Sequence, residues 1–180
     1  QELWKDLSTA SPNKGHLFFK RLYDEGKLAG LITQNIDGLH EKSGLPKGII
    51  VNLHGTNLEV ACLDCGYTVP SEDVFDRLDL ELGVPLCPEC EGFFKPNTIS
   101  FGQQLRGEDL SRANDLAVSC DLMIVVGSTL VVQPASSIPS IAKEKGALLS
   151  IITLSETPLD SYADFVFHLK VEDFITLFQS

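Results

Sequence analysis

Two cysteine pairs with metal-binding spacing, CLDC at 62–65 and CPEC at 87–90, stand 21 residues apart in the chain. A Cys-x-x-Cys loop brings two thiolates to one ion, and two such loops complete a tetrahedral shell of four sulfurs, which suits Zn²⁺. That shell has no open coordination position. We therefore expect one structural zinc ion, bound by Cys62, Cys65, Cys87 and Cys90. A redox dithiol and an iron–sulfur centre are the alternatives that the spacing leaves open.

A second group of candidates comprises polar residues that directly follow apolar segments. ITQNIDGLH (32–40) passes from apolar residues into amides and a carboxylate, and VNLHG (51–55) ends in His54 and a glycine. In open α/β sheets the carboxyl ends of strands hold ligands, and an imidazole there can exchange protons near neutral pH. The alternatives are that 32–40 forms an ordinary surface turn and that His54 has no catalytic role. His16 and His168 lie in periodic apolar stretches, which favours partly buried imidazoles with satisfied hydrogen bonds.

A third candidate is the segment GSTLVVQPAS (127–136), which begins where a continuous apolar run ends. Gly127 allows a close backbone approach, and Ser128 and Thr129 offer hydroxyl and amide groups to a phosphate before the next helix. A strand-to-helix turn also uses Gly and Ser, so an ordinary turn is the alternative. The chain contains no GxGxxG, no GxxxxGK[ST] and no GxSxG motif.

The composition limits the classes of function. The chain has 180 residues and a net charge of −11, with its 14 Lys and Arg scattered. An acidic surface repels phosphate backbones, so we expect no direct nucleic-acid partner, whereas a lysine-rich tail would be attracted. No apolar run approaches the roughly 20 residues of a membrane span, and the start resembles no signal peptide. Paired cysteines in such a chain favour metal over disulfides and a cytoplasmic location. The start without Met indicates an excerpt of a longer protein.

These candidates must be positioned by the surrounding elements. Continuous apolar runs predict buried strands at 28–33, 49–55, 121–128, 147–154 and 165–169. Helices are expected at 135–146, at 171–178, and from Ser11 as N-cap with Pro12 at the first position to a stop at Gly26. Residues 38–48 are expected to form a loop or one short helix, and His40 lies in this stretch. The alternation predicts a doubly wound, mostly parallel, Rossmann-like α/β sheet made of 1–57 and 101–180, with a small zinc-ribbon module of 58–100 inserted.

Taken in order, these motifs resemble those of the sirtuin family of NAD-dependent protein deacylases. The resemblance runs through PNKGH (12–16), TQNIDGLH (33–40), NLHG (52–55), both cysteine pairs, KPNTISFGQ (95–103), VVGSTLVVQPAS (125–136) and SETPLD (155–160). It therefore covers nearly the whole chain. It implies removal of acetyl or other acyl groups from protein lysines, with NAD as cosubstrate and nicotinamide and O-acyl-ADP-ribose as products.

The resemblance also assigns roles to particular residues. His54 matches the catalytic base, which helps to deprotonate ribose hydroxyls, and the matches to NAD-binding positions are Gln34, Asn35, Asp37, Gly127, Ser128, Thr129, Thr153, Leu154 and Val171. The first three of these hold nicotinamide and its ribose, with the Asp37 carboxylate on the carboxamide. An acyl-lysine peptide or protein would pair as a strand at positions matched by Ile99, Phe101 and Val132. Two departures are Thr153, where Asn is usual, and Gln103, where Glu is common.

The larger departure is at the start of the chain. Sirtuins open with a Gly-Ala-Gly phosphate loop on a central strand and a mobile cofactor loop, and nothing before Gln34 resembles either. We therefore expect an incomplete NAD-binding domain that binds NAD weakly. The alternative function is a truncated, weakly active or inactive zinc-stabilised module that binds peptide or ADP-ribose. A zinc-ribbon nucleic-acid protein and an unrelated dinucleotide-binding oxidoreductase are further alternatives, disfavoured by the charge and by the absent glycine fingerprint.

Overall fold

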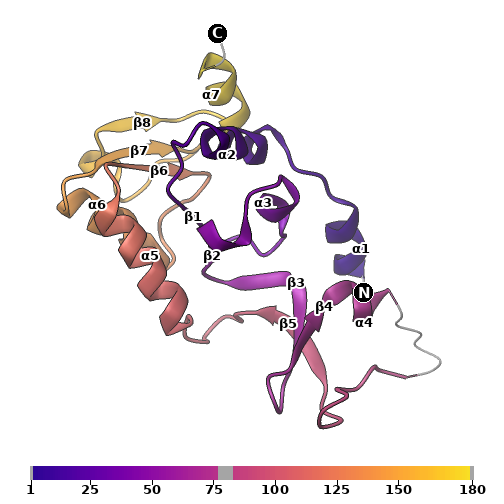
Figure 1. Cartoon of the computed structure of the whole chain (residues 1–180). Coiled ribbons are helices and arrows are strands. Elements are labelled where there is room, and N and C mark those ends of the chain that lie inside the picture. The colour runs from indigo at the N-terminus through magenta and orange to yellow at the C-terminus, as the bar shows by residue number, and fades with distance from the viewer. Residues whose placement is uncertain (1, 77–82, 179–180) are drawn as a thin grey trace.

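The computed structural model describes residues 2–76 and 83–178 and contains both parallel and antiparallel sheets (Figure 1). The strands are β1 (Leu31–Thr33), β2 (Ile50–Asn52), β3 (Gly55–Cys62), β4 (Thr68–Pro70), β5 (Phe94–Thr98), β6 (Leu122–Val126), β7 (Leu148–Ile152) and β8 (Phe165–Phe167). The helices are α1 (Glu2–Thr9), α2 (Lys14–Asp24), α3 (Leu39–Lys42), α4 (Ser71–Phe75), α5 (Gly107–Ser119), α6 (Ile138–Glu144) and α7 (Val171–Phe178). Short 3₁₀ turns cover Lys47–Ile49, Ala135–Ser137 and Asp160–Tyr162.

The parallel part of the structure consists of two separate sheets. One contains β1 and β2, and the other has the order β6-β7-β8. All three strand pairings in them are parallel, which confirms the predicted mixed α/β fold with parallel strands joined by helices. Among the described residues, the two parallel sheets share no ladder of hydrogen bonds. The sheet that the sequence predicts is therefore divided.

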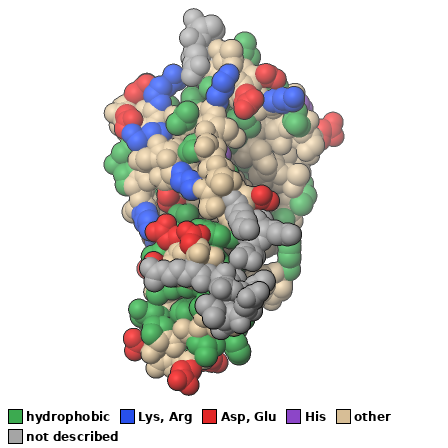
Figure 2. All heavy atoms as spheres, turned by 90° about the vertical axis from the view of Figure 1, so that its right-hand side faces the viewer, with side chains coloured by type: hydrophobic (Ala, Val, Ile, Leu, Met, Phe, Trp, Pro, Cys, Tyr) green, Lys and Arg blue, Asp and Glu red, His purple; other side chains and the backbone are tan. Residues whose placement is uncertain are grey.

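The third sheet carries the cysteine pairs. It is antiparallel with the order β4-β3-β5, and β3 pairs with β5 at Gly55 and again from Val60 to Cys62, with a register shift between the two. Because β3 begins at Gly55, this sheet starts three residues before the boundary expected at 58, and the division into 1–57, 58–100 and 101–180 stays a prediction. Figure 2 shows hydrophobic side chains gathered at the lower end of the molecule. The exposed apolar residues of this part include Leu63 and Phe93.

A helix that the sequence analysis did not predict covers the core of the β1–β2 side. The α5 residues Ala113 and Ala117 are fully buried against Val51 and Leu53 of the β2 segment and against α6. Alanine adds little to an apolar periodicity, but its small side chain allows close packing of backbones. The second parallel sheet is covered by α2 and α7, whose Phe18, Phe174 and Ile175 pack on Ile152.

The start of α2 differs from the prediction. Asn13, not Ser11, is the N-cap, and its Oδ1 accepts from the backbone N–H groups of Gly15 and His16 at 2.9 and 3.2 Å. The His16 side chain accepts from the Asn13 N–H in return, which completes a capping box. The predicted stop is confirmed, because Gly26 follows the helix with a positive φ of 68°.

Helix α1, at the N-terminal end of the described chain, packs against the part of the structure that contains the antiparallel sheet. Figure 1 shows α1 beside α4. The Trp4 ring lies 5.6 Å from that of Phe75, and Trp4 Nε1 donates to Asp76 Oδ1 at 2.8 Å. The sequence analysis assigned no element to this stretch.

Candidate active site and metal centre

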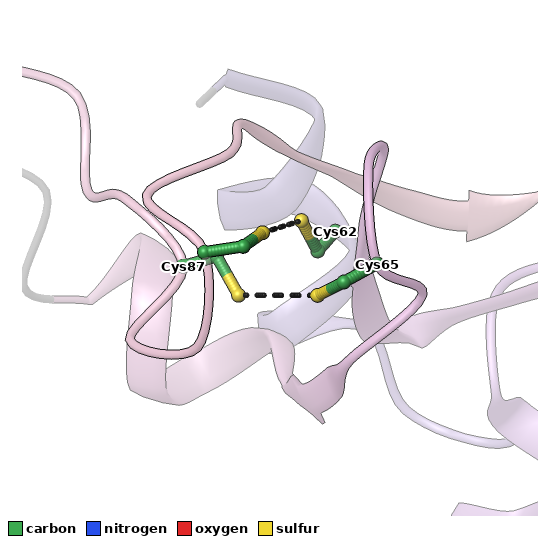
Figure 3. A group of neighbouring side chains, drawn as sticks. Cys62, Cys65 and Cys87 are labelled. Atoms are coloured by element: carbon green, nitrogen blue, oxygen red, sulfur yellow. Dashed lines mark hydrogen bonds between the residues drawn. The ribbon is translucent and has the colours of Figure 1, made fainter.

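The four paired cysteines converge on one point of the antiparallel part. The labelled Cys62, Cys65 and Cys87 point toward one another from two facing loops (Figure 3), and all four sulfurs lie within 4.8 Å of each other. The Cys62–Cys90 and Cys65–Cys87 sulfur separations are 3.5 and 3.6 Å. Four sulfurs bound to one Zn²⁺ at about 2.3 Å would lie about 3.8 Å apart in a tetrahedron. The cluster therefore fits the predicted zinc ion.

The four thiols lie so close together that they shift one another's pKa. The backbone N–H of Cys65 and then that of Asp64 lower the pKa of Cys62 to about 7, although desolvation opposes them. At Cys90 the Gly92 N–H lowers the pKa, but the neighbouring sulfurs of Cys65 and Cys62 outweigh it and raise the pKa to about 12. Four thiols at this distance cannot all ionise unless a cation compensates their charge, and thiolates are the form that binds metal.

The first candidate ligand edge lies where β1 and β2 end together. Because the strands are parallel and Thr33 pairs with Asn52, the residues that follow, Gln34 and His54, meet at the same edge. The Leu53 N–H donates to the Thr33 carbonyl at 3.0 Å and extends the ladder by one step. The two polar segments that the sequence analysis placed at strand ends therefore lie side by side.

His54 is held in one ring orientation by its backbone neighbours. Its Nδ1 lies 3.1 Å from the Gln34 carbonyl oxygen. A carbonyl only accepts, so Nδ1 carries the hydrogen and Nε2 keeps its lone pair. The His54 carbonyl accepts from the Ile99 N–H at 2.8 Å, which ties this histidine to the segment after β5. The half-buried imidazole can thus take a proton at Nε2.

The loop between Gln34 and α3 is held by hydrogen bonds from its backbone to nearby side chains. The Asn35 N–H donates to Thr33 Oγ1 at 3.0 Å, and Asp37 Oδ1 accepts from the Leu39 N–H at 2.9 Å. Gly38 adopts a φ of 69°, and a side chain there would meet Leu58 at 2.6 Å. Such a contact leaves no space for a β-carbon. The loop therefore holds the Asp37 carboxylate at a defined place beside the edge that carries His54.

The second candidate edge lies where β6 and β7 end. Val126 pairs with Ile152, and the Gly127 N–H donates to the Ile152 carbonyl at 2.9 Å, so the Gly-Ser-Thr segment and Thr153 start from the same edge. Ser128 Oγ accepts from the Leu130 N–H at 3.2 Å. Gly127 has a φ of 64°, and apart from its two neighbours in the chain no described residue has an atom within 4 Å of the position that a β-carbon would take there. Its surroundings are thus open to a ligand.

The remaining predicted contact residues differ in exposure. Thr153 is buried, with its N–H donating to the Phe167 carbonyl at 3.1 Å, whereas Leu154 is 67% exposed. Val171 is the first residue of α7. Of the predicted peptide contacts, Ile99 is half-buried, and Phe101 and Val132 are exposed. The backbone hydrogen bond described above brings Ile99 next to His54.

The sequence analysis missed two polar features near the first edge. The rings of His16 and His40 lie 4.7 Å apart, and His40 Nδ1 is buried without a hydrogen-bond partner among the described residues. Asn57 is also buried, and its Nδ2 lacks a partner within the same part of the chain. The one sequence signal for these features was the Asn13-x-x-His16 spacing, which is that of a capping box. It indicates a role for His16 and says nothing of His40 or Asn57.

Comparisons with known proteins identify the family of this chain. The Sir2 family model matches residues 2–134. An NAD-dependent protein deacetylase of Bradyrhizobium diazoefficiens is 42% identical over 160 residues, covering 89% of this chain and 63% of the relative. One of Sulfurisphaera tokodaii is 39% identical over 171 residues, covering 95% of this chain and 66% of the relative. The chain thus spans slightly less than two thirds of the length of these curated relatives.

Solved structures of Sir2 proteins show the same fold. A complex of Sir2 with p53 peptide and NAD⁺ has a TM-score of 0.87 at 37% identity, covering 96% of this chain and 70% of that one. Sir2 bound to an acetylated peptide has a TM-score of 0.88 at 35% identity, covering 98% and 74%. Together with the family model, these matches show that the chain belongs to the Sir2 family, the sirtuins.

Proposed function

We propose that the protein that carries this chain is an NAD-dependent protein deacylase. It would remove acetyl or other acyl groups from lysines of proteins or peptides and yield nicotinamide and O-acyl-ADP-ribose. The observation that carries the proposal is the arrangement at the β1–β2 edge. There the Gln34 carbonyl fixes the Nδ1–H tautomer of His54, so Nε2 is free to act as a general base.

The two strand edges supply the proposed NAD-binding groups. The carboxylate of Asp37 would accept N–H groups of the carboxamide, with Asn35 and Gln34 beside it. On the other edge, Gly127 has open space at its α-carbon, and Ser128 and Thr129 would bind phosphate and ribose together with Thr153, Leu154 and Val171. NAD supplies an electrophilic ribose carbon from which nicotinamide departs. His54 Nε2 would accept the proton of a ribose hydroxyl.

The acyl-lysine substrate would bind next to β5. Ile99 is tied to His54 through its N–H, and a peptide strand pairing here would place its lysine toward that histidine. The side chain of Phe101 is fully exposed and that of Val132 is 44% exposed, so both are available to contact a peptide. Sir2 structures with propionylated and acetylated peptides support this assignment by similarity.

A non-catalytic module that binds peptide or ADP-ribose is the second candidate. The division of the parallel strands into two sheets favours it, because among the described residues the two halves of the proposed NAD site stand on sheets that share no ladder of hydrogen bonds. Product analysis separates the candidates. Incubation with NAD and an acetyl-lysine peptide should give equal amounts of deacylated peptide and O-acetyl-ADP-ribose by mass spectrometry. Peptide binding without either product would support the binding module.

The proposal includes a cytoplasmic location. The supporting observation is the cluster of four cysteines at metal-binding distances, since reducing compartments keep such thiols free for metal. Cell fractionation with a tagged full-length protein tests it, and recovery from the periplasm or the medium would contradict it. Among the residues that the structure describes, no helix is long and apolar enough to cross a membrane.

A further inference from the structure

A pocket of about 460 Å³ lies between the end of β3, strand β5 and the 99–106 segment. Its polar lining includes Lys95, Asn97, Gln103, Gln104 and Arg106. The described residues of the lining include two cations and no acidic side chain, although the whole chain has 25 acidic and 14 basic residues. The pocket is thus a local positive site in an acidic protein.

The two cations keep their charge available to a ligand. Lys95 Nζ donates to the Thr98 carbonyl at 2.7 Å, and an Arg106 terminal nitrogen donates to Asn97 Oδ1. Both acceptors are neutral oxygens, which orient the cations without neutralising them. Arginine has five N–H donors in a fixed fork, so the Asn97 bonds leave donors on Arg106 for a further acceptor.

The carboxylate of Glu59, which contacts the lining residue Asn97, is already engaged. Glu59 Oε2 accepts from Asn97 Nδ2 at 3.4 Å, and the other Glu59 oxygen lies 3.9 Å from Lys47 Nζ. Asn97 therefore stands between Glu59 and Arg106, with its amide nitrogen toward the acid and its oxygen toward the cation. This arrangement separates Glu59 from the pocket and leaves Arg106 without a carboxylate partner among the described residues.

The pocket fits a carboxylate on a short aliphatic chain. A carboxylate binds an arginine fork through two parallel hydrogen bonds, and the Gln104 amide adds a neutral donor beside it. Apolar lining residues, among them Ile99 and Leu63, would contact methylene groups. A glutamate side chain and a small free dicarboxylate share this chemistry.

Ile99 connects this pocket to the proposed acyl-lysine site, because the same residue lines the pocket and donates its N–H to the His54 carbonyl. We propose that the Lys95–Arg106 pocket binds the carboxylate of an acidic residue that flanks the acyl-lysine in the substrate peptide. This inference rests on the proposed peptide-binding function. It makes the preferred substrate an acyl-lysine segment with a glutamate near the modified lysine.

The test uses a charge change that keeps the local geometry. Gln103 Oε1 accepts from the Ser100 N–H at 2.7 Å, and Gln103→Glu retains an acceptor oxygen of the same shape while adding a negative charge to the lining. Acetyl-lysine peptides with Glu or Gln on each side of the lysine, one position at a time, are titrated by calorimetry. One Glu peptide should bind about fivefold more tightly than its Gln partner, the effect of one partly exposed charge pair. Gln103→Glu should abolish this difference.

A small probe separates the pocket from the substrate. N-acetylglutamate amide should shift the NMR signal of the Arg106 side chain in the zinc-loaded chain, and N-acetylglutamine amide should not. If neither peptide binds but this shift appears, the proposed peptide function fails while the carboxylate pocket stands. Titration with glutarate then tests whether the natural ligand of the pocket is a free dicarboxylate. Equal affinity of every Glu and Gln pair, together with no Arg106 shift, would overturn the inference.

Discussion

Replacing Gly55 by alanine should destabilise the protein strongly, because Gly55, the first residue of β3, packs directly against the backbone of β5. Gly55 has a φ of 74°, and a β-carbon there would lie 2.2 Å from the Asn97 carbonyl oxygen and 2.9 Å from the Thr98 α-carbon. Both contacts are with the backbone of the paired strand β5. They cannot be relieved by rotating a side chain, so the β3–β5 pairing itself must shift.

The magnitude follows from two contributions. A left-handed conformation costs an L-residue about 1–2 kcal/mol, and overpacking against rigid neighbours costs a further 1–3 kcal/mol or so. We expect Gly55→Ala to lower the free energy of unfolding by about 3 kcal/mol. Gly26 is the matched control, because its φ of 68° is similar and nothing lies within 4 Å of its β-carbon position. Gly26→Ala should cost only the conformational part, about 1–2 kcal/mol.

Urea denaturation of the zinc-loaded variants gives both free-energy changes, and thermal denaturation gives the melting temperatures, each followed by circular dichroism. At about 2–4 °C per kcal/mol for a chain of this size, the melting temperature of Gly55→Ala should fall by about 6–12 °C. Equal losses for Gly55→Ala and Gly26→Ala would refute the reasoning, since the contact with β5 would then contribute nothing.

Three further predictions concern metal, pH and nicotinamide. Cys87→Ala should release the one equivalent of zinc detected by atomic emission and unfold the antiparallel part, whereas Cys120→Ala should retain it; equal zinc contents would count against the site. Burial lowers the pKa of His16 and His40 below the ordinary 6.5, so the unfolded chain binds more protons below that pH. The free energy of unfolding should therefore fall as pH drops below about 6.5, and a pH-independent value between 7 and 5 would contradict this. In a protein with turnover, Asp37→Asn should weaken nicotinamide inhibition about tenfold, by loss of charge-assisted hydrogen bonds, and an unchanged inhibition constant would argue against its assignment.

Strong local signals made much of the molecule predictable. The spacing of CLDC and CPEC determined the metal centre, because four thiols on two short loops have few other arrangements. The apolar runs that contain β6 and β7 are long enough to identify parallel strands. Burial was predicted correctly for β7, which is buried from Leu149 to Ile152, but not for β6, in which Val125 alone is buried. The carboxyl ends of such strands then gave the positions of His54 and Gly127 without any tertiary information.

Other features depend on contacts that one-dimensional patterns do not contain. Helix α5 buries Ala113 and Ala117, whose small side chains leave only a weak periodicity. The true N-cap of α2 is Asn13 because its side chain reaches two backbone N–H groups. Ser11 followed by Pro12 also has the pattern of a helix start, so the sequence alone favoured Ser11. The His16–His40 ring contact joins residues 24 positions apart, and the pocket cations come from β5 and the segment before α5.

The most direct test of the account is the effect of His54→Ala on NAD-dependent deacylation by the full protein that carries this chain. Removal of a general base should lower the rate of O-acetyl-ADP-ribose formation by about 100-fold or more, while NAD affinity measured by calorimetry stays within about threefold of wild type. His168→Ala is the control, since this histidine is partly exposed and pairs with Asp160, and it should keep near-normal turnover. Wild-type turnover in the His54→Ala variant would contradict the central claim that His54 is the catalytic base.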